Sequence, residues 1–436
     1  MLIKKKGGQA LIGLVESVAE KNKLTPEIVA NLLAQALKTA FLKEYPDNVV
    51  DVVVDLEKSR IEIWRELMVV TDEFYKTDGF EDAETLIPIS KVNTLPKTSK
   101  NPSRPKIGDL VYKEVDMNQF DGKITTNIQI FFKKLTENEV SRVTCQKWIQ
   151  YQGTVLEGTV EEILENKDDR SLKKIIVSMI APDGSTAKGV ITKADLVWFD
   201  VHGNRVYENL SLGQTYLFYI KEVSEINVHF PIILSRTDAE IVKYLMTKHI
   251  SEISEGLVEI KGIARIAGQK SKVLVSSNSK NIDPVGCCIG PKGKRLKVIS
   301  SELMNEKIDV ILWSEDPVQN VINSFVTGKI IGYRLEPEPN TITLIATLDN
   351  LLACIGKRGT NTKLVYMLTN WKINMKTIQE AKDENIDYVS VDDSKFVGSN
   401  KISERIFKMH FKKSEDILND YYSEDKSEKD GSKGKK

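Results

Sequence analysis

Two short segments of the chain share one pattern, and this repeat is the feature that most restricts the fold. The first runs Asp283-Pro-Val-Gly-Cys-Cys-Ile-Gly-Pro-Lys-Gly-Lys-Arg-Leu and the second Leu351-Leu-Ala-Cys-Ile-Gly-Lys-Arg-Gly-Thr-Asn-Thr-Lys-Leu. Each predicts a short apolar helix, a Gly-x-x-Gly turn with basic residues and a second helix. A similar strand follows each copy, over residues 307–313 and 371–376. The chain therefore carries one structural unit twice.

The turn is built for contact with a sugar-phosphate chain. Its glycines permit positive φ and carry no Cβ, and the helix that follows directs free N–H groups and its positive dipole end at phosphates. This is the working element of a KH domain, which clamps about four nucleotides of single-stranded nucleic acid. The predicted RNA-binding residues are Gly290, Pro291, Lys292, Gly293, Lys294, Arg295 and Lys297 in the first turn, and Gly356, Lys357, Arg358, Gly359 and Lys363 in the second.

A nucleotide-binding P-loop is excluded at the first turn. Its signature is Gly-x-x-x-x-Gly-Lys-Ser/Thr. Gly286, Gly290 and Gly293 lack that spacing, and Arg295 follows Lys294 where Ser or Thr is needed. ATP or GTP binding is not expected there.

Composition indicates a globular, intracellular chain. Its 436 residues suggest about three domains. No window reaches the roughly 18 apolar residues of a membrane span. The four cysteines, Cys145, Cys287, Cys288 and Cys354, form no Cys-x-x-Cys pair, and with four scattered histidines they do not make a zinc site. We expect a reduced, cytoplasmic protein that needs no metal and no cofactor.

The net charge of zero hides an asymmetry. Residues 237–376, which hold both turns, carry 19 Lys and Arg against 14 Asp and Glu. Residues 1–145 carry 21 against 22, and residues 146–236 carry 10 against 12. Positive charge is thus concentrated where a phosphate-binding surface requires it.

Residues 1–145 read as one α/β domain. Two helices are expected before residue 45: one with the apolar face Leu11, Leu14, Val15 and Val18, and one that begins at the N-cap Thr25 with Pro26 in its first turn. Alternating apolar residues predict strands over 49–56 and 60–70. Residues 80–106 form a Pro/Ser/Lys-rich excursion, and a long helical pattern covers 117–151.

Residues 152–236 predict a barrel of the OB type. Five short strands are expected over 153–160, 172–180, 187–192, 215–223 and 231–235. The segments Gly153–Val160 and Gly189–Leu196 resemble an S1 domain, which binds single-stranded RNA. OB surfaces stack bases on aromatic side chains, and the candidates here are Trp198, Phe199, Tyr207 and Tyr219.

The remainder predicts two tandem KH domains of the prokaryotic type (type II), over 237–316 and 317–378. Each has the order α-β-β-α-α-β. No linker beyond Ser314–Pro317 separates them, so we expect them to pack as one rigid body. The charged segment 379–436 has few apolar residues and is expected to be largely disordered. The fold class is therefore multidomain α+β.

The order of an N-terminal α/β domain, S1, KH and KH resembles the NusA family of bacterial transcription factors. The segments that carry the resemblance include Pro231–Thr237, Val258–Arg265, Asp283–Arg295, Glu306–Pro317 and Ile355–Trp371. It implies that residues 1–145 bind the RNA polymerase core near the RNA exit channel and that 152–378 contact the nascent single-stranded RNA. The implied role is in pausing, termination and antitermination, as a monomer and with other Nus factors as further partners. Acidic C-terminal repeats of longer members find no counterpart after residue 378.

Two other classes of protein remain open. A phosphorolytic exoribonuclease also carries KH and S1 domains, but there KH precedes S1 and large catalytic domains precede both. Only about 145 residues lie upstream here, and their carboxylates form no recognisable metal-binding cluster, so no enzyme activity is expected. A ribosome-associated RNA-binding protein without polymerase contact fits the same chemistry, and only the family resemblance argues against it.

Overall fold

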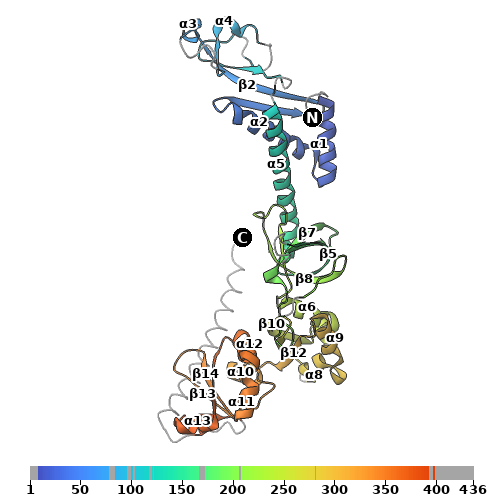
Figure 1. Ribbon diagram of the computed structural model, residues 1–436, viewed down its shortest axis with the longest axis vertical. Coiled ribbons are helices and arrows are strands. Elements are labelled where there is room, and N and C mark those ends of the chain that lie inside the picture. Colours follow the sequence, from blue (N-terminus) through green and yellow to red (C-terminus); the bar gives the residue numbers. More distant parts are fainter. Residues whose placement is uncertain are drawn as a thin grey trace, which may run out of the picture. The chain divides into compact units, whose positions relative to one another are not determined.

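A computed structural model describes residues 8–77, 84–95, 100–101, 104–116, 120, 122–165, 172–205, 208–279, 281–391 and 396–397 (Figure 1). The chain divides into two compact units. The first is Met1–Gln150 with Val223–Ile232, and the second is Tyr151–Glu222 with Ile233–Lys436. Among the described residues, no helix is both long and apolar enough to span a bilayer.

The first unit combines helices with a small mixed sheet, as its patterns predict. Its elements are α1 (Gly8–Asn22), α2 (Pro26–Glu44), β1 (Val49–Asp55), β2 (Arg60–Val70), α3 (Asp72–Tyr75), β3 (Leu86–Pro88), α4 (Ile89–Val92), β4 (Leu110–Glu114) and α5 (Gly122–Trp148). The predicted N-cap of α2 is confirmed, because the Thr25 side chain accepts a hydrogen bond from the Ile28 amide at 3.4 Å. β2 pairs antiparallel with β1 and β4 and parallel with β3.

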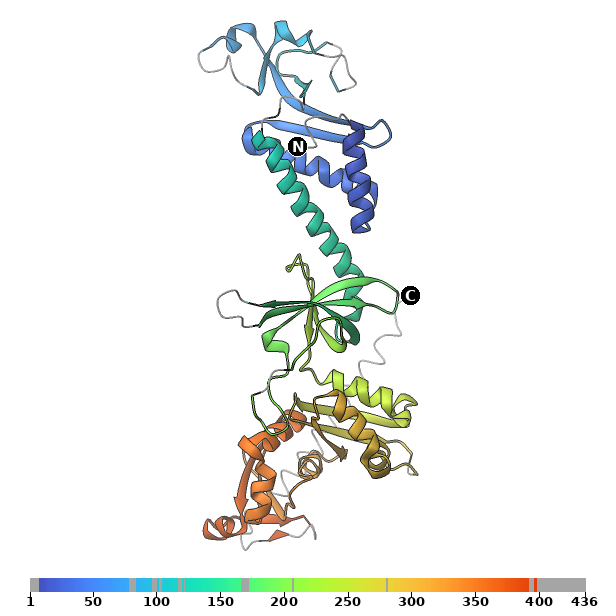
Figure 2. The same ribbon diagram turned by 45° about the vertical axis from the view of Figure 1, so that its right-hand side comes forward.

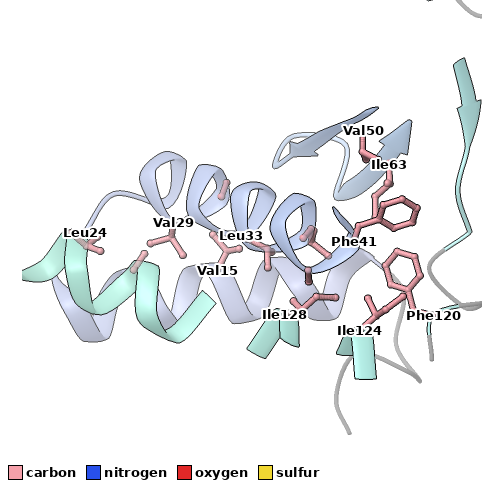
Figure 3. Packing of buried hydrophobic residues seen from close by; sticks show 14 residues of the cluster. Val15, Leu24, Val29, Leu33, Phe41, Val50, Ile63, Phe120, Ile124 and Ile128 are labelled. Atoms are coloured by element: carbon pink, nitrogen blue, oxygen red, sulfur yellow. The ribbon is translucent and has the colours of Figure 1, made fainter. Parts of the chain in front are cut away.

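Two separate cores lie along the length of β2. The larger one joins α1, α2 and α5 to the β1–β2 hairpin, and Phe41 sits in it beside Phe120 with their ring centroids 6.0 Å apart (Figure 3). The smaller one collects Leu67, Val69, Ile87, Val92 and Val111. Part of the Pro/Ser/Lys-rich excursion is therefore ordered, because residues 84–95 form β3 and α4 and bury apolar side chains there.

The predicted OB-type barrel is confirmed. Its strands are β5 (Val155–Glu165), β6 (Leu172–Ile180), β7 (Thr186–Thr192), β8 (Thr215–Val223) and β9 (Ile232–Ser235), and they close in the order β5-β6-β7-β9-β8 (Figure 2). Closure brings strands close together at Gly158, where an added Cβ would meet Val177 and Phe218. Glycine is needed there for space.

The two KH domains repeat one topology. The first contains α6 (Glu240–His249), α7 (Ser251–Ser254), β10 (Val258–Ile266), β11 (Lys270–Ser277), α8 (Pro284–Ile289), η4 (Pro291–Gly293), α9 (Lys294–Glu302) and β12 (Lys307–Leu312). The second contains α10 (Pro317–Asn323), β13 (Gly332–Leu335), β14 (Thr341–Ala346), α11 (Leu348–Ile355), η5 (Lys357–Gly359), α12 (Thr360–Thr369) and β15 (Lys372–Thr377). In each, the middle strand pairs antiparallel with the strand before it and parallel with the strand after the helices.

Helix α12 of the second KH domain packs against β10 of the first, as the short linker predicts (Figure 1). Leu368 on α12 lies over Gly262. At the same interface Lys272, fully buried on β11, donates hydrogen bonds to Asp309 at 2.9 Å and to the Ser324 carbonyl at 2.6 Å. The two KH domains are therefore held together by a buried charge as well as by apolar contact.

The segment after residue 378, which is expected to be largely disordered, has an ordered start. Helix α13 (Ile378–Asp383) begins with a capping box formed by Thr377 and Glu380. Strand β16 (Tyr388–Ser390) pairs with β13, and β17 (Phe396–Val397) pairs with β16. The buried residues Ala381 and Val389 stabilise this extension. The expectation for residues 392–395 and 398–436 lies outside the described residues, as does the candidate Tyr207.

Candidate nucleic-acid interface

The two Gly-x-x-Gly turns have the same backbone conformation. The first glycine, the third residue and the last glycine have positive φ in each: 69°, 54° and 70° for Gly290, Lys292 and Gly293, and 69°, 53° and 71° for Gly356, Arg358 and Gly359. The positive φ of all four glycines confirms the conformation predicted from the Gly-x-x-Gly spacing. The left-handed lysine and arginine were not predicted, and each costs about 1–2 kcal/mol. Backbone strain of this kind clusters at functional sites.

Each turn leads directly into a helix whose first amides lack a side-chain cap. Gly293 is the N-cap of α9 and Gly359 that of α12, and neither has a side chain to accept a hydrogen bond. The amides of Lys294 and Thr360 already donate to the carbonyls of Pro291 and Lys357. The next N–H groups of each helix, with the positive end of the helix dipole, suit an anion. Both turns therefore present donors and positive potential together.

The first turn leaves most of its cations available. Lys292, Lys294 and Lys297 are exposed, and none has an ion pair within the part of the chain that the structure describes. Arg295 differs, since its Nη1 donates to Glu252 at 2.9 Å and to the Cys287 carbonyl at 2.6 Å. It ties α9 to α7 and α8, so its predicted RNA contact competes with a structural one.

The second turn touches the S1 barrel. Lys357 Nζ donates to the carbonyl of His202 at 2.6 Å, and Arg358 Nη1 lies 3.5 Å from the carbonyl of Gly203. Lys363, on α12, is exposed. This contact joins residues that are 155 positions apart in the chain, and no local sequence pattern predicts it.

The aromatic candidates of the barrel fall into two groups. Trp198 is flanked by Lys193 and Arg205, whose charged groups lie 5.2 and 5.1 Å from its ring centroid. Phe199 follows and is 36% exposed. These two remain candidates for base stacking. Tyr219 instead packs against the core shared by the barrel and the first KH domain, and this burial raises the pKa of its hydroxyl.

A buried network of arginines and glutamates fixes the barrel against the first KH domain. Arg265 donates to Glu306 at 3.0–3.2 Å and to the carbonyls of Arg236 and Asp238 at 3.1 and 2.7 Å. Arg236 in turn pairs with Glu208. None of these residues is among the sequence-based candidates. Only Arg265 lies inside a strand, where a charged residue is a signal for a buried pair.

The cysteines before the turns serve packing. Burial raises the pKa of Cys288 to about 12 and that of Cys354 to about 11. Both are fully buried, and their thiols stay protonated at neutral pH.

Three parts of the chain match known families, in chain order. The NusA N-terminal domain matches residues 10–141, the NusA-like first KH domain 236–313 and the NusA-like second KH domain 317–383. The transcription termination/antitermination protein NusA of Mycoplasma genitalium is 30% identical over 385 residues, which cover 87% of this chain and 68% of that protein. The chain belongs to the NusA family. This family comprises transcription factors and not enzymes.

Other relatives agree. NusA of Mycoplasma pneumoniae is 29% identical over 385 residues, covering 87% of this chain and 67% of that protein. NusA of Halalkalibacterium halodurans is 41% identical over 165 residues, covering 38% and 43%. The chain thus spans about two thirds of the length of the mycoplasmal NusA proteins.

Proposed function

We propose that the protein is a transcription elongation factor that binds RNA polymerase through its first unit and emerging single-stranded RNA through its S1 and KH domains. It acts on pausing, intrinsic termination and antitermination. The observation that carries the RNA-binding part is the pair of uncapped helix N-termini behind matching Gly-x-x-Gly turns. The polymerase-binding part rests on the NusA N-terminal domain over residues 10–141.

The RNA surface is proposed to comprise two classes of residue. The phosphate-binding residues are the glycines and cations of the turns, Gly290, Pro291, Lys292, Gly293, Lys294, Arg295 and Lys297 with Gly356, Lys357, Arg358, Gly359 and Lys363. Trp198 and Phe199 add base stacking on the barrel. Rigid packing of the two KH domains supports linked binding, because the second turn then meets RNA already held by the first.

A transcription assay tests the proposal directly. Purified RNA polymerase transcribes a template with a hairpin-dependent pause and an intrinsic terminator, with and without the full chain. We expect a longer pause and more termination when the protein is present. Unchanged pause lifetime and termination at saturating protein would contradict the proposal.

The ribosome-associated alternative predicts a different partner. The tagged full chain is mixed with purified polymerase core or with purified ribosomes, both treated with nuclease so that RNA cannot bridge. Retention of polymerase supports the proposed role. Retention of ribosomes without polymerase would favour the alternative.

A further inference from the structure

Lys272 places a charged side chain inside the interface between the two KH domains. It lies on β11, is fully buried, and donates hydrogen bonds to Asp309 at 2.9 Å and to the Ser324 carbonyl at 2.6 Å. Asp309 lies on β12 of the same domain, whereas Ser324 ends helix α10 of the second domain. An ammonium group suits that carbonyl, because the C-terminal end of a helix carries partial negative charge. One side chain thus bonds to both domains.

The ion pair with Asp309 does not by itself explain a lysine at this position. Loss of solvation lowers the pKa of Lys272, and the Asp309 carboxylate opposes that shift. A lysine is almost never fully buried unless it is paired. Asp309 already has a second cation, since Lys270 pairs with it at 2.7 Å. What Lys272 adds is the hydrogen bond to Ser324.

The second KH domain shows that this fold does not require a lysine here. Lys272 stands opposite Asp309 in the pairing of β11 with β12, and Thr343 stands opposite Asn374 in the pairing of β14 with β15. The two positions are equivalent, because each is third from the start of the paired segment. Thr343 is also buried but neutral, and it donates to Glu336 of its own domain at 2.6 Å. The buried charge therefore occurs in the domain on which another domain is docked.

Lys272 lies on a short path of packed elements between the two turns. Helix α8, which leads into the first turn, packs against β11. Helix α10 packs against α12, and α12 follows the second turn directly. Helix α12 also packs against β10 and β11 of the first domain. A shift of α10 away from Lys272 would therefore move the second turn relative to the first.

We infer that Lys272 is a positioning residue, whose bond to the Ser324 carbonyl fixes the separation of the two Gly-x-x-Gly turns and so favours RNA strands that reach both turns at once. The inference rests on the proposed RNA-binding function. Linked sites gain affinity according to the length and stiffness of their connection. Lys272 acts only through this connection, because its side chain is fully buried and offers no surface to RNA.

Lys270 supplies a matched control on the same strand. Lys272→Met and Lys270→Met each remove one positive charge, and each leaves Asp309 with one of its two lysines. Of the two lysines, only Lys272 donates to the second KH domain in the part of the chain that the structure describes. A difference between the two variants therefore reports the bond between the domains.

The test is a titration of the full chain with two random-sequence RNA pools. The pools contain about twelve and about six nucleotides; because each KH domain holds about four, only the longer RNA can occupy both turns. The unchanged protein should bind the longer pool on the order of a hundredfold more tightly, a gain typical of linked sites. Lys272→Met should lower this ratio of affinities at least about tenfold and alter affinity for the shorter pool less than about twofold. Lys270→Met should keep the ratio.

The ratio separates positioning from stability. Partial unfolding would weaken the binding of both pools by the same factor and leave the ratio unchanged, and thermal melts show whether each variant is folded. Leu368→Ala is the second variant. It opens the same interface from α12, where Leu368 lies over Gly262, and removes no buried charge. It should lower the ratio as well, and it provides the test if Lys272→Met does not fold.

Failure of the inference differs from failure of the proposed function. An unchanged ratio in folded Lys272→Met, or in Leu368→Ala if Lys272→Met is unfolded, would overturn the inference and leave RNA binding intact. An equal fall of the ratio in Lys272→Met and Lys270→Met would assign the effect to charge and also overturn it. If the unchanged protein binds neither pool, the RNA-binding function itself fails.

Discussion

Neutralising Glu306 should destabilise the second unit more than any surface change of the same chemistry. The Glu306 side chain is 0% exposed and that of Arg265 3% exposed. The carboxylate accepts from Arg265, from the Gly268 amide at 2.9 Å and from the Ser271 hydroxyl at 2.5 Å. Glu306→Gln keeps the shape but leaves the guanidinium without a counter-charge, and breaking a buried pair in this way costs about 3–5 kcal/mol.

The control is Glu240→Gln. Glu240 pairs with Lys243 at 3.3 Å on the exposed surface of α6, with side chains 43% and 51% exposed. Loss of such a surface pair costs about 0–1 kcal/mol. Removing both buried charges, by Arg265→Met with Glu306→Leu, should not restore full stability. The Gly268 amide and the Ser271 hydroxyl would remain unpaired, at about 1–3 kcal/mol each.

Hydrogen exchange at native conditions measures the effect where it arises. A chain with two units need not unfold in one step, so a single melting curve does not define one free energy. Peptides from β10 and β11 report the second unit, and peptides from β1 and β2 serve as an internal reference. We expect faster exchange in β10 and β11 and unchanged exchange in β1 and β2. Suppose that Glu306→Gln lowers the free energy of opening in β10 and β11 by less than about 1 kcal/mol, as little as Glu240→Gln does. That result would refute the assigned role of the buried pair.

Three shorter predictions concern packing, thiol chemistry and division of labour. Gly268→Ala should lower the melting temperature more than Gly184→Ala. Both positions have positive φ (77° and 79°), but only at Gly268 would the new Cβ overlap the Phe199 carbonyl. Equal decreases of the melting temperature would argue against that contact. Burial raises the pKa of Cys288 to about 12. The rate of its alkylation in the folded protein should therefore be low at pH 8 and rise about tenfold per pH unit. Fast alkylation at pH 8 without unfolding would contradict its burial. The truncated chain 146–436 should keep RNA binding and lose polymerase binding when RNA is absent, as measured by co-sedimentation; full polymerase affinity would contradict the division.

Local patterns predicted most of the fold. Strands 172–180 and 215–223 form as expected because short runs rich in β-branched and aromatic residues, bounded by turns, are typical of strands. The turns were found because glycine spacing reports backbone conformation directly. The ordered start of the segment after residue 378 was not predicted because its composition is charged and because β16 pairs with β13, which is distant in sequence.

Contacts between domains could not be predicted in the same way. The hydrogen bond from Lys357 to the His202 carbonyl depends on how the barrel and the second KH domain meet, which no local pattern encodes. Within the first KH domain, Arg265 on β10 and Glu306 before β12 are 41 residues apart, and their pairing depends on the register of both strands with β11. Tyr219 shows the converse: an aromatic residue on a barrel strand suits base stacking, but here it packs against the first KH domain.

The central claim is that the two turns hold RNA phosphates. The most direct measurement compares the full chain with a variant carrying Pro291→Asp and Lys292→Asp in the first turn and Lys357→Asp and Arg358→Asp in the second. These residues are exposed, and surface changes alter stability by about 0.5 kcal/mol or less each. RNA titrations at several salt concentrations should show affinity almost abolished and the salt dependence flattened, because fewer phosphates are neutralised. Unchanged RNA affinity with a melt like that of the parent protein would mean that the turns are only structural corners and that the barrel carries the binding.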